Sequence, residues 1–292
     1  PQVQQSTVST FELQRKPFWE IIRNRPVYVI GWWASWPARP LWGVLITDYF
    51  YFWRKEEARD FRPEPEWLAA TGLTWPPELL LHFQPQLIRA DQVSTTMLER
   101  ELKISLPAET PPQDQIPGPQ PLEQLRTAYA MDETHFRIAE ELLVRGSKQG
   151  LYAVYVRGID LVSHAALRFS DLYPEVSGAL PQSAQFGPLV SKYYAYLFGR
   201  IRRLAQLAGP ETLLIVVSDH GFDYDPKLPE LFGHYHAPPG VLIVSHPTAD
   251  RIRWAQQPTV YDICPTLLWL AGYPQAEDMP GRRMAEILPE QD

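Results

Sequence analysis

Aspartate and histidine side chains stand directly after apolar runs of this sequence, where they could bind a metal ion. Asp160 and His164 follow the run at residues 151–156, which is predicted to be a strand buried on both faces. Open α/β sheets bind ligands beyond the carboxyl ends of their strands. An Asp and a His four residues apart, where a strand leads into a helix, can converge on one ion. The same spacing also occurs by chance, so this pair alone is a weak indication.

A second pair, Asp219 and His220, follows the apolar run at residues 213–217. Two ionisable residues after a strand are costly to bury without a partner. Gly221 permits a turn that would let both side chains face one ion. The alternative is that Asp219 caps a turn beside a histidine that is satisfied by other partners, and the residues leave both interpretations open.

The third place is the segment 233–240, which contains His234 and His236 and precedes the apolar run at 241–244. One of the two histidines could be a ligand, while the other supports it or faces solvent. Four of the seven histidines of the chain lie in these three places. Mixed Asp and His ligation without a thiolate suits Zn2+, and manganese less well, and it leaves open positions for a substrate.

Taken together, these segments resemble the alkaline phosphatase superfamily, within its type I phosphodiesterase/nucleotide pyrophosphatase branch. The motifs that carry the resemblance are GIDLVSH (158–164), VVSDHGF (216–222), GHYHAPPG (233–240), VYDICPTLLWLAGYP (260–274) and DMPGRRM (278–284). Three earlier stretches are also similar to that branch: FWEII (18–22), VIGWWASWPARP (29–40) and VLITD (44–48). The resemblance therefore covers nearly the whole chain.

The resemblance implies a site for two Zn2+ ions, with Mn2+ as the alternative metal. The ligands that it implies are Asp160, His164 and His236 for one ion, and Asp219 and His220 for the other. His234 is the alternative ligand, since it could exchange roles with His236. Otherwise it could contact the ligands without binding the metal itself.

In the family, the second zinc site is completed by an aspartate that ends the first strand and by a Thr or Ser nucleophile. We expect both upstream of Pro1, because the Ser and Thr residues at 6–10 follow no strand and no suitable Asp. The chain as given is thus expected to lack its N-terminal strand and nucleophile, to carry no catalytic nucleophile and to be inactive alone. The full-length protein is expected to be an enzyme.

The activity that the resemblance implies is metal-dependent hydrolysis of a small phosphate ester, of the phosphodiesterase or nucleotide pyrophosphatase type. The substrate could be a nucleotide. A phosphomonoesterase or phosphonate hydrolase of the same superfamily is the nearest alternative. A sulfatase is disfavoured, because the surroundings of Cys264 do not match the C-x-P-x-R pattern of that class. An alternative of a different class is an inactive metal-binding remnant or an interaction module.

Helical and strand patterns alternate along the chain, which predicts an α/β fold with a mostly parallel central sheet. We expect a three-layer αβα sandwich, alkaline phosphatase-like, that forms a single catalytic domain over residues 1–292. The predicted strands are 27–32, 43–47, 151–156, 213–217 and 241–244, and the predicted helices are 18–22, 122–146, 189–204 and 262–270. Residues 106–121 are rich in proline, which removes backbone donors, and are predicted to be a surface loop.

Tryptophans cluster after the first predicted strand. Trp32, Trp33 and Trp36 lie in an aromatic loop there and are candidates for a substrate wall that stacks a flat leaving group. The alternative is that they cover an edge of the core.

Bulk composition excludes several classes of protein. Hydrophobic residues make up 45% of the 292 residues and charged residues 21%, which is typical of a globular chain and not of a disordered one. The net charge of −7 gives no support to binding of a nucleic-acid polymer. No apolar run reaches the length of a transmembrane helix. With Cys264 as its single cysteine the chain can form no internal disulfide, and the sequence indicates neither a compartment nor an oligomeric state.

Overall fold

The computed structural model describes residues 9–52, 72–107, 119–178, 180, 182–225, 228–234, 236–245 and 252–288. Contacts within the chain group into two compact units. Unit 1 comprises Pro1–Leu87, Arg137–Tyr155 and Thr248–Asp292, and unit 2 comprises Ile88–Phe136 and Val156–Pro247. That residues 1–292 act as a single catalytic domain stays a prediction.

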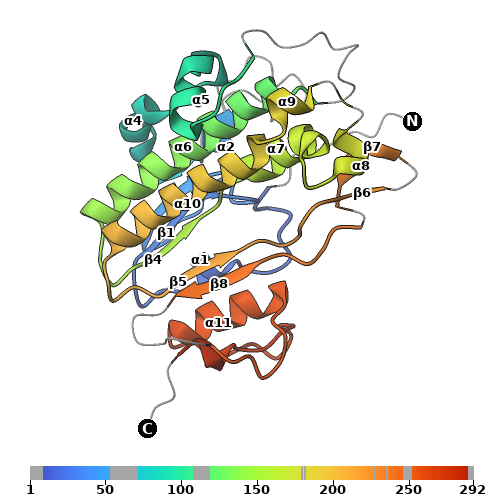
Figure 1. Ribbon diagram of the computed structural model, residues 1–292. Coiled ribbons are helices and arrows are strands. Elements are labelled where there is room, and N and C mark those ends of the chain that lie inside the picture. The colour runs from blue at the N-terminus through green and yellow to red at the C-terminus, as the bar shows by residue number, and fades with distance from the viewer. Residues whose placement is uncertain are drawn as a thin grey trace, which may run out of the picture. The chain divides into compact units, whose positions relative to one another are not determined.

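A four-stranded sheet forms the centre of unit 1, as the blue and green arrows of Figure 1 show. Its strands, in the order β3-β2-β1-β4, are β3 (Thr74–Trp75), β2 (Gly43–Thr47), β1 (Val27–Trp32) and β4 (Leu151–Val154). β1 runs parallel to β2 and to β4, whereas β3 is antiparallel to β2. The predicted α/β class with a mostly parallel central sheet is therefore confirmed.

β1 is the central strand, and its composition explains its place. Val27, Val29 and Ile30 have no exposed surface, as expected for a strand that is covered on both faces. Gly43 begins β2 opposite Val27 with a φ of +142°, and a Cβ there would overlap the Val27 backbone. Only glycine allows the two chains to approach so closely at this point.

Short helices complete unit 1. They are α1 (Phe18–Ile21), α2 (Tyr49–Phe52), α4 (Leu79–Phe83) and α11 (Ile263–Leu270), with 3-10 turns at Gln84–Gln86, Val260–Asp262 and Ala285–Ile287. α1 and α11 share a core with the sheet through Phe18, Trp19 and Leu268. The predicted end of α11 is confirmed: Gly272 has a φ of +83°, and the next amide, that of Tyr273, donates to Leu268 O at 2.9 Å.

Asp262 stands at the N-cap of α11, as predicted, but its side chain does not cap that helix. Its carboxylate accepts from the backbone N–H of Thr259 at 2.8 Å and from that of Arg282 at 2.7 Å. These bonds, with the nearby Arg282 charge, hold the pKa of Asp262 below its usual range although burial opposes this. The residue thus ties the chain before α11 to the chain after it.

Unit 2 is mainly helical. Its helices are α5 (Thr95–Leu102), the first part of α6 (Pro121–Arg145), α7 (Gly158–Ala166), α8 (Pro174–Ser177), α9 (Ser183–Phe186) and α10 (Leu189–Ala208), with 3-10 turns at Ala90–Gln92 and Leu167–Phe169. Figure 1 shows α6 and α10 side by side, and the ring centroids of Tyr129 and Tyr196 lie 5.4 Å apart between them. α7 packs against α10.

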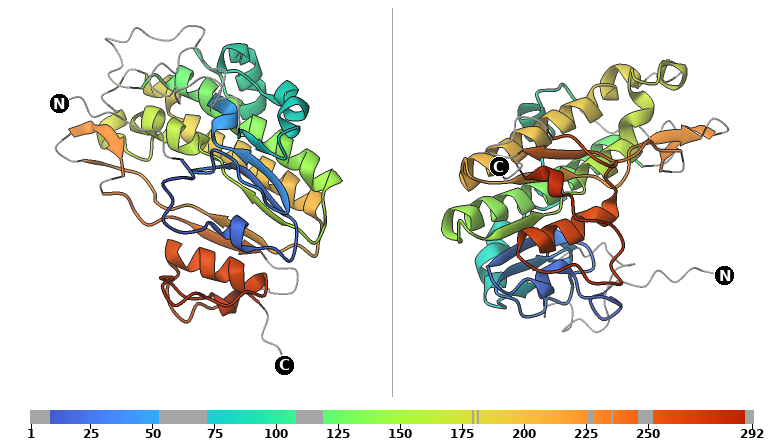
Figure 2. Two further views of the ribbon diagram at one scale, coloured as in Figure 1. Left: turned by 180° about the vertical axis from the view of Figure 1, so that it is seen from behind. Right: turned by 90° about the horizontal axis from the view of Figure 1, so that it is seen from below.

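Two small antiparallel sheets belong to unit 2. β5 (Leu214–Val217) pairs with β8 (Leu242–Ser245), and β6 (Asp223–Asp225) pairs with β7 (Leu228–Gly233) in a hairpin that Figure 2 shows in orange. Both β5 and β8 were predicted as strands, but the helix–strand alternation favoured parallel pairing. The described part of the connection from β5 to β8 contains no helix, and antiparallel strands need no crossover helix.

Most of the predicted proline-rich loop, residues 108–118, lies outside the described residues. The flanking residues 104–107 and 119–120 form no helix or strand, in agreement with a loop. At its end the prediction was one residue too long, because Pro121 begins α6. Proline is tolerated in the first turn of a helix, where its missing N–H would have no partner.

Within the described part of the chain, no helix combines the length and the apolar character that crossing a bilayer requires.

Candidate metal centre

α7 carries the first two predicted ligands. It begins at Gly158, four residues after the end of β4, so Asp160 lies in its first turn and His164 one turn later. Residues four apart share one face of a helix. His164 Nε2 accordingly lies 3.6 Å from Asp160 Oδ1. The predicted change from strand to helix at this point is confirmed.

The loop after β5 carries the next pair, and backbone bonds hold it against the segment before β8. Gly221 N donates to Pro238 O at 2.9 Å, and Ser218 N donates to Val241 O at 2.8 Å. His220 itself forms a β-bridge with Pro239. A Cβ on Gly221 would meet the Pro238 ring at 2.7 Å, so the close approach requires glycine at 221.

Asp160, His220 and His234 form a group in which one potential ligand atom of each lies within 4.8 Å of the others. His234 Nε2 is 3.1 Å from Asp160 Oδ1. The His234 ring lies 3.8 Å from the His220 ring and 4.8 Å from the His164 ring, centroid to centroid. The structure therefore brings three histidines and one aspartate together from α7, the β5 loop and the end of β7.

Hydrogen bonds to backbone carbonyls fix two of the imidazoles. His164 Nδ1 lies 3.1 Å from Phe232 O, and His220 Nδ1 lies 2.9 Å from Gly221 O. A carbonyl oxygen only accepts, so each Nδ1 carries the proton and donates it. In a neutral imidazole Nε2 then keeps its lone pair, which is the arrangement that backbone carbonyls impose on metal-binding histidines.

Phe222 contacts all three imidazoles. Its ring centroid is 4.9 Å from that of His164, 5.6 Å from that of His220 and 4.9 Å from that of His234, with interplanar angles of 83°, 68° and 82°. Edge-to-face contacts of this kind restrict the orientation of each ring. A single phenyl ring therefore helps to orient the rings of all three histidines.

The residues present fit a zinc ion by the chemistry of their donors. Ligand atoms bound at about 2.0–2.1 Å in tetrahedral geometry are about 3.3 Å apart. The separations of 3.1 and 3.6 Å between Asp160 Oδ1 and the Nε2 atoms of His234 and His164 are close to this value. Asp160 Oδ2 lies 3.8 Å from Arg157 Nε, which helps to orient the carboxylate.

Asp219 and His236 lie differently from the other predicted ligands. The Asp219 side chain is 78% exposed, and its Oδ1 lies 3.7 Å from His220 Nε2. His236 is exposed in the turn after His234 and is not in the group of close ligand atoms. The resemblance gave the ligand role to His236 with His234 as the alternative, and the described geometry favours the alternative. The assignment of individual ligands stays a prediction.

The tryptophan loop divides between core and surface. Trp32 packs against Phe18 and Trp19, and Trp36 is 4% exposed. The Trp33 side chain is half exposed and lies near Tyr155. For Trp32 and Trp36 the structure favours the alternative interpretation, the cover of a core edge, and it leaves Trp33 as the one candidate of the three for a substrate wall.

Asp132 on α6 was not predicted from the sequence as a residue of the site. It is fully buried beside α7. It accepts from the N–H groups of Arg157 and Gly158 and from Tyr193 Oη. Burial raises the pKa of its carboxyl to about 7. A signal was present in the sequence: with Tyr129 before it and Phe136 after it, Asp132 occupies a place in the apolar stripe of the helix.

The partly buried carboxyl group of Asp48 lies directly after β2 in unit 1. Burial raises its pKa to about 6, and Ser35 Oγ lies 3.1 Å from its Oδ1. The Asp48 amide also donates to Ser35 Oγ at 3.2 Å. These bonds join the loops that follow β1 and β2. Within the described residues, Asp48 belongs to no group of three or more potential metal ligands.

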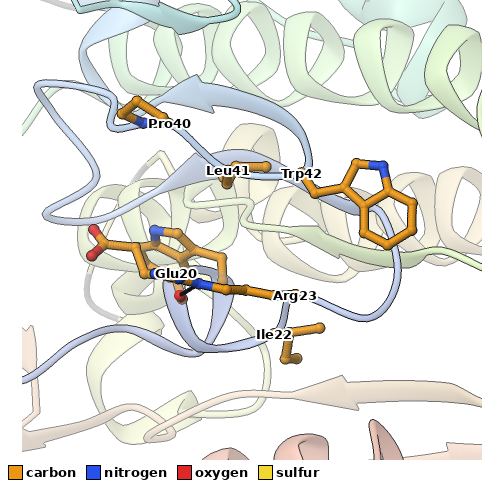
Figure 3. A pocket seen from close by; sticks show the side chains of 7 residues that line it. Glu20, Ile22, Arg23, Pro40, Leu41 and Trp42 are labelled. Atoms are coloured by element: carbon orange, nitrogen blue, oxygen red, sulfur yellow. Dashed lines mark hydrogen bonds between the residues drawn. The ribbon is translucent and has the colours of Figure 1, made fainter.

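A pocket of about 370 Å³ lies in unit 1, between α1 and the segment before β2 (Figure 3). Its lining is mostly apolar and aromatic, with Glu20 and Arg23 as its charged residues. Arg39 lies 3.6 Å from the Glu20 carboxylate. No histidine lines the pocket, which therefore offers no donor set comparable to that of the cluster around Asp160.

Comparison of the chain with family models, with curated proteins and with solved structures finds no match in any of the three.

Proposed function

We propose that the protein is a metal-dependent hydrolase of phosphate esters, and that two Zn2+ ions bind around Asp160. The observation that carries the proposal is the donor set of Asp160, His164, His220 and His234, in which backbone carbonyls orient two imidazoles. Histidines with a purely structural role would not need to converge in this way, because each can be satisfied by its own hydrogen-bond partner. The proposal extends to Mn2+ as the alternative metal.

Asp160 has the central role in this proposal. Its Oδ1 faces His164 and His234, while Arg157 neutralises part of its charge from the other side. His220 joins the group through its contact with His234, and the exposed Asp219 beside it is available to the second ion. Bound divalent ions act as Lewis acids that polarise phosphoryl oxygens and offset charge in the transition state.

The reaction class comes from the resemblance to the type I phosphodiesterase/nucleotide pyrophosphatase branch, and the small-molecule substrate is part of the same proposal. The proposal includes a Thr or Ser hydroxyl as the nucleophile that attacks phosphorus. The protein chain itself would hold the phosphate ester beside Asp160 and Asp219, where the side chains are partly exposed to solvent. Of the three tryptophans proposed for a substrate wall, Trp33 is the one with an exposed side chain.

The test uses the full-length protein, stripped with a chelator and reloaded with Zn2+ or with Mn2+. Hydrolysis of bis-p-nitrophenyl phosphate and of p-nitrophenyl phosphate is then compared, which separates a diesterase from a monoesterase. His220→Ala should lower the rate by about 100-fold or more, since loss of even a supporting partner costs 10–100-fold. His82→Ala is the control, because His82 pairs with Glu141 outside the cluster.

Full turnover without metal, or equal rates for the two histidine variants, would refute the proposal. Tight zinc binding without turnover on either ester would leave the metal centre in place and exclude the catalytic role. The protein would then be a metal-binding or interaction module, which is the alternative of a different class.

A further inference from the structure

The first backbone N–H groups of α7 are bonded by a side chain from another helix. Arg157 stands at the N-cap of α7, and its own side chain makes no capping bond. Instead, Asp132 Oδ1 accepts from Arg157 N at 3.1 Å and from Gly158 N at 3.0 Å. The opening amides of a helix have no partner within it, and a carboxyl group there also interacts favourably with the helix dipole.

Asp132 is itself held from a third helix. Tyr193 on α10 donates its hydroxyl to Asp132 Oδ2 at 2.8 Å. Both residues have no exposed surface, so neither can exchange its partner for water. A buried polar group that loses its hydrogen bond destabilises the folded protein, so this pair holds the N-terminus of α7 in one position.

Gly158 shows how closely α7 approaches this pair. A Cβ at this position would overlap the Tyr193 hydroxyl and the Asp132 carboxyl group. The N-terminus of α7 thus lies in direct contact with the side chains of Asp132 and Tyr193. Asp160 follows two residues later and His164 six residues later, on a helix of nine residues.

We propose that Asp132 and Tyr193 are positioning residues of the metal centre, which set the place of Asp160 and His164 by anchoring the N-terminus of α7. The inference rests on the proposed function, because it takes Asp160 and His164 as ligands. Neither Asp132 nor Tyr193 touches the ion or the substrate; they act through the backbone of α7.

A matched pair of tyrosines on α10 tests the inference. Tyr196 is also buried and donates to the next acidic residue of α6, with Tyr196 Oη 2.9 Å from Glu133 Oε2. Phenylalanine at either position removes one buried hydroxyl–carboxylate bond from the same pair of helices. Only the bond of Tyr193 leads to the N-terminus of α7.

The measurement is the dissociation constant for Zn2+, obtained by competition with a chromophoric chelator for the wild type, Tyr193→Phe and Tyr196→Phe. We expect Asp132→Asn to weaken zinc binding about 10-fold or more, the lower end of the range for supporting residues. For Tyr193→Phe we expect a smaller loss of about 3- to 10-fold, because this residue acts through Asp132. Tyr196→Phe should bind like the wild type. The absorption spectrum of the Co2+-loaded protein, which reports ligand geometry, should change for Tyr193→Phe and not for Tyr196→Phe.

Thermal unfolding of the metal-free variants separates positioning from a general loss of stability. Equal destabilisation of the two tyrosine variants with unequal zinc affinity supports the inference. Equal zinc affinity and equal Co2+ spectra in all three proteins would overturn it while leaving the metal centre intact. If the wild type binds no metal, the proposed function fails as well.

Discussion

The clearest test of the candidate site compares alanine substitutions at His234 and at His236, which lie two positions apart in one segment. His234 Nε2 is 3.1 Å from Asp160 Oδ1, and the His234 ring is 3.8 Å from the His220 ring. His236 is exposed and lies outside that group of ligand atoms. His234→Ala should therefore remove a ligand, while His236→Ala should remove only a surface side chain.

The magnitude follows from the usual strength of zinc sites. Apparent binding free energies of structural zinc sites are about 10–16 kcal/mol, or about 2.5–4 kcal/mol for each of four ligands. Since each 1.4 kcal/mol is a factor of ten, His234→Ala should weaken zinc binding by about 100-fold or more. For His236→Ala we expect a change below about twofold, as for other surface substitutions.

Isothermal titration of the metal-free protein with Zn2+ measures both constants and the number of ions bound. The double variant is the internal control and should match His234→Ala alone. A loss in His236→Ala as large as that in His234→Ala would contradict the reasoning from geometry. A loss in His236→Ala alone would restore the ligand set that the family resemblance implies.

Three further predictions concern the supports of the site and the stability of each unit. Burial raises the pKa of Asp132 from 3.8 to about 7, so between these values the native protein binds a proton that the unfolded chain has lost. The free energy of unfolding should then fall by up to about 4 kcal/mol as pH rises from about 4 to 7. Urea unfolding at several pH values should show this pH-dependent loss of stability in the wild type and not in Asp132→Asn. Phe222→Leu should weaken zinc binding about 3- to 10-fold in the same titration, since it removes three edge contacts with imidazoles, and an unchanged constant would contradict that role. The hydrogen bond from Arg282 lowers the pKa of Glu286 to about 2. The ionised Glu286 should therefore stabilise the protein above about pH 4.5, and this stabilisation should be lost as pH falls toward 2. Glu286→Gln should reduce the loss of thermal stability at acid pH, and a pH profile identical to that of the wild type would refute this prediction.

The elements with strong apolar patterns could be predicted from the sequence. β1 and β2 have the predicted bounds, because continuous β-branched and aromatic runs identify strands that are buried on both faces. Long amphipathic helices such as α6 and α10 were recognisable from apolar residues at helical spacing. The partners of β5 and β8 were not predictable in the same way, because apolar runs do not encode strand direction.

The ligand set was only partly predictable for a related reason. Asp160 and His164 lie on a helix, where four-residue spacing fixes a shared face, and the structure brings them together as expected. His234 and His236 lie outside any helix, at the end of β7 and in the turn after it, and no periodicity tells which of them faces Asp160. The choice is made by packing: Phe222 and the His220 ring lie against His234.

Two different supports thus hold the cluster, and they should respond differently to substitution. Asp160 and His164 share one rigid helix whose N-terminus is seated on Asp132, so a change there moves both ligands together. His220 and His234 come from loops that backbone bonds and the Phe222 ring hold in place, so a change there moves imidazoles and spares the Asp160 carboxylate. Zinc affinity alone would not separate these two cases. Ligand geometry would separate them, because only the first case alters the position of the Asp160 carboxylate, and the Co2+ spectrum reports that change.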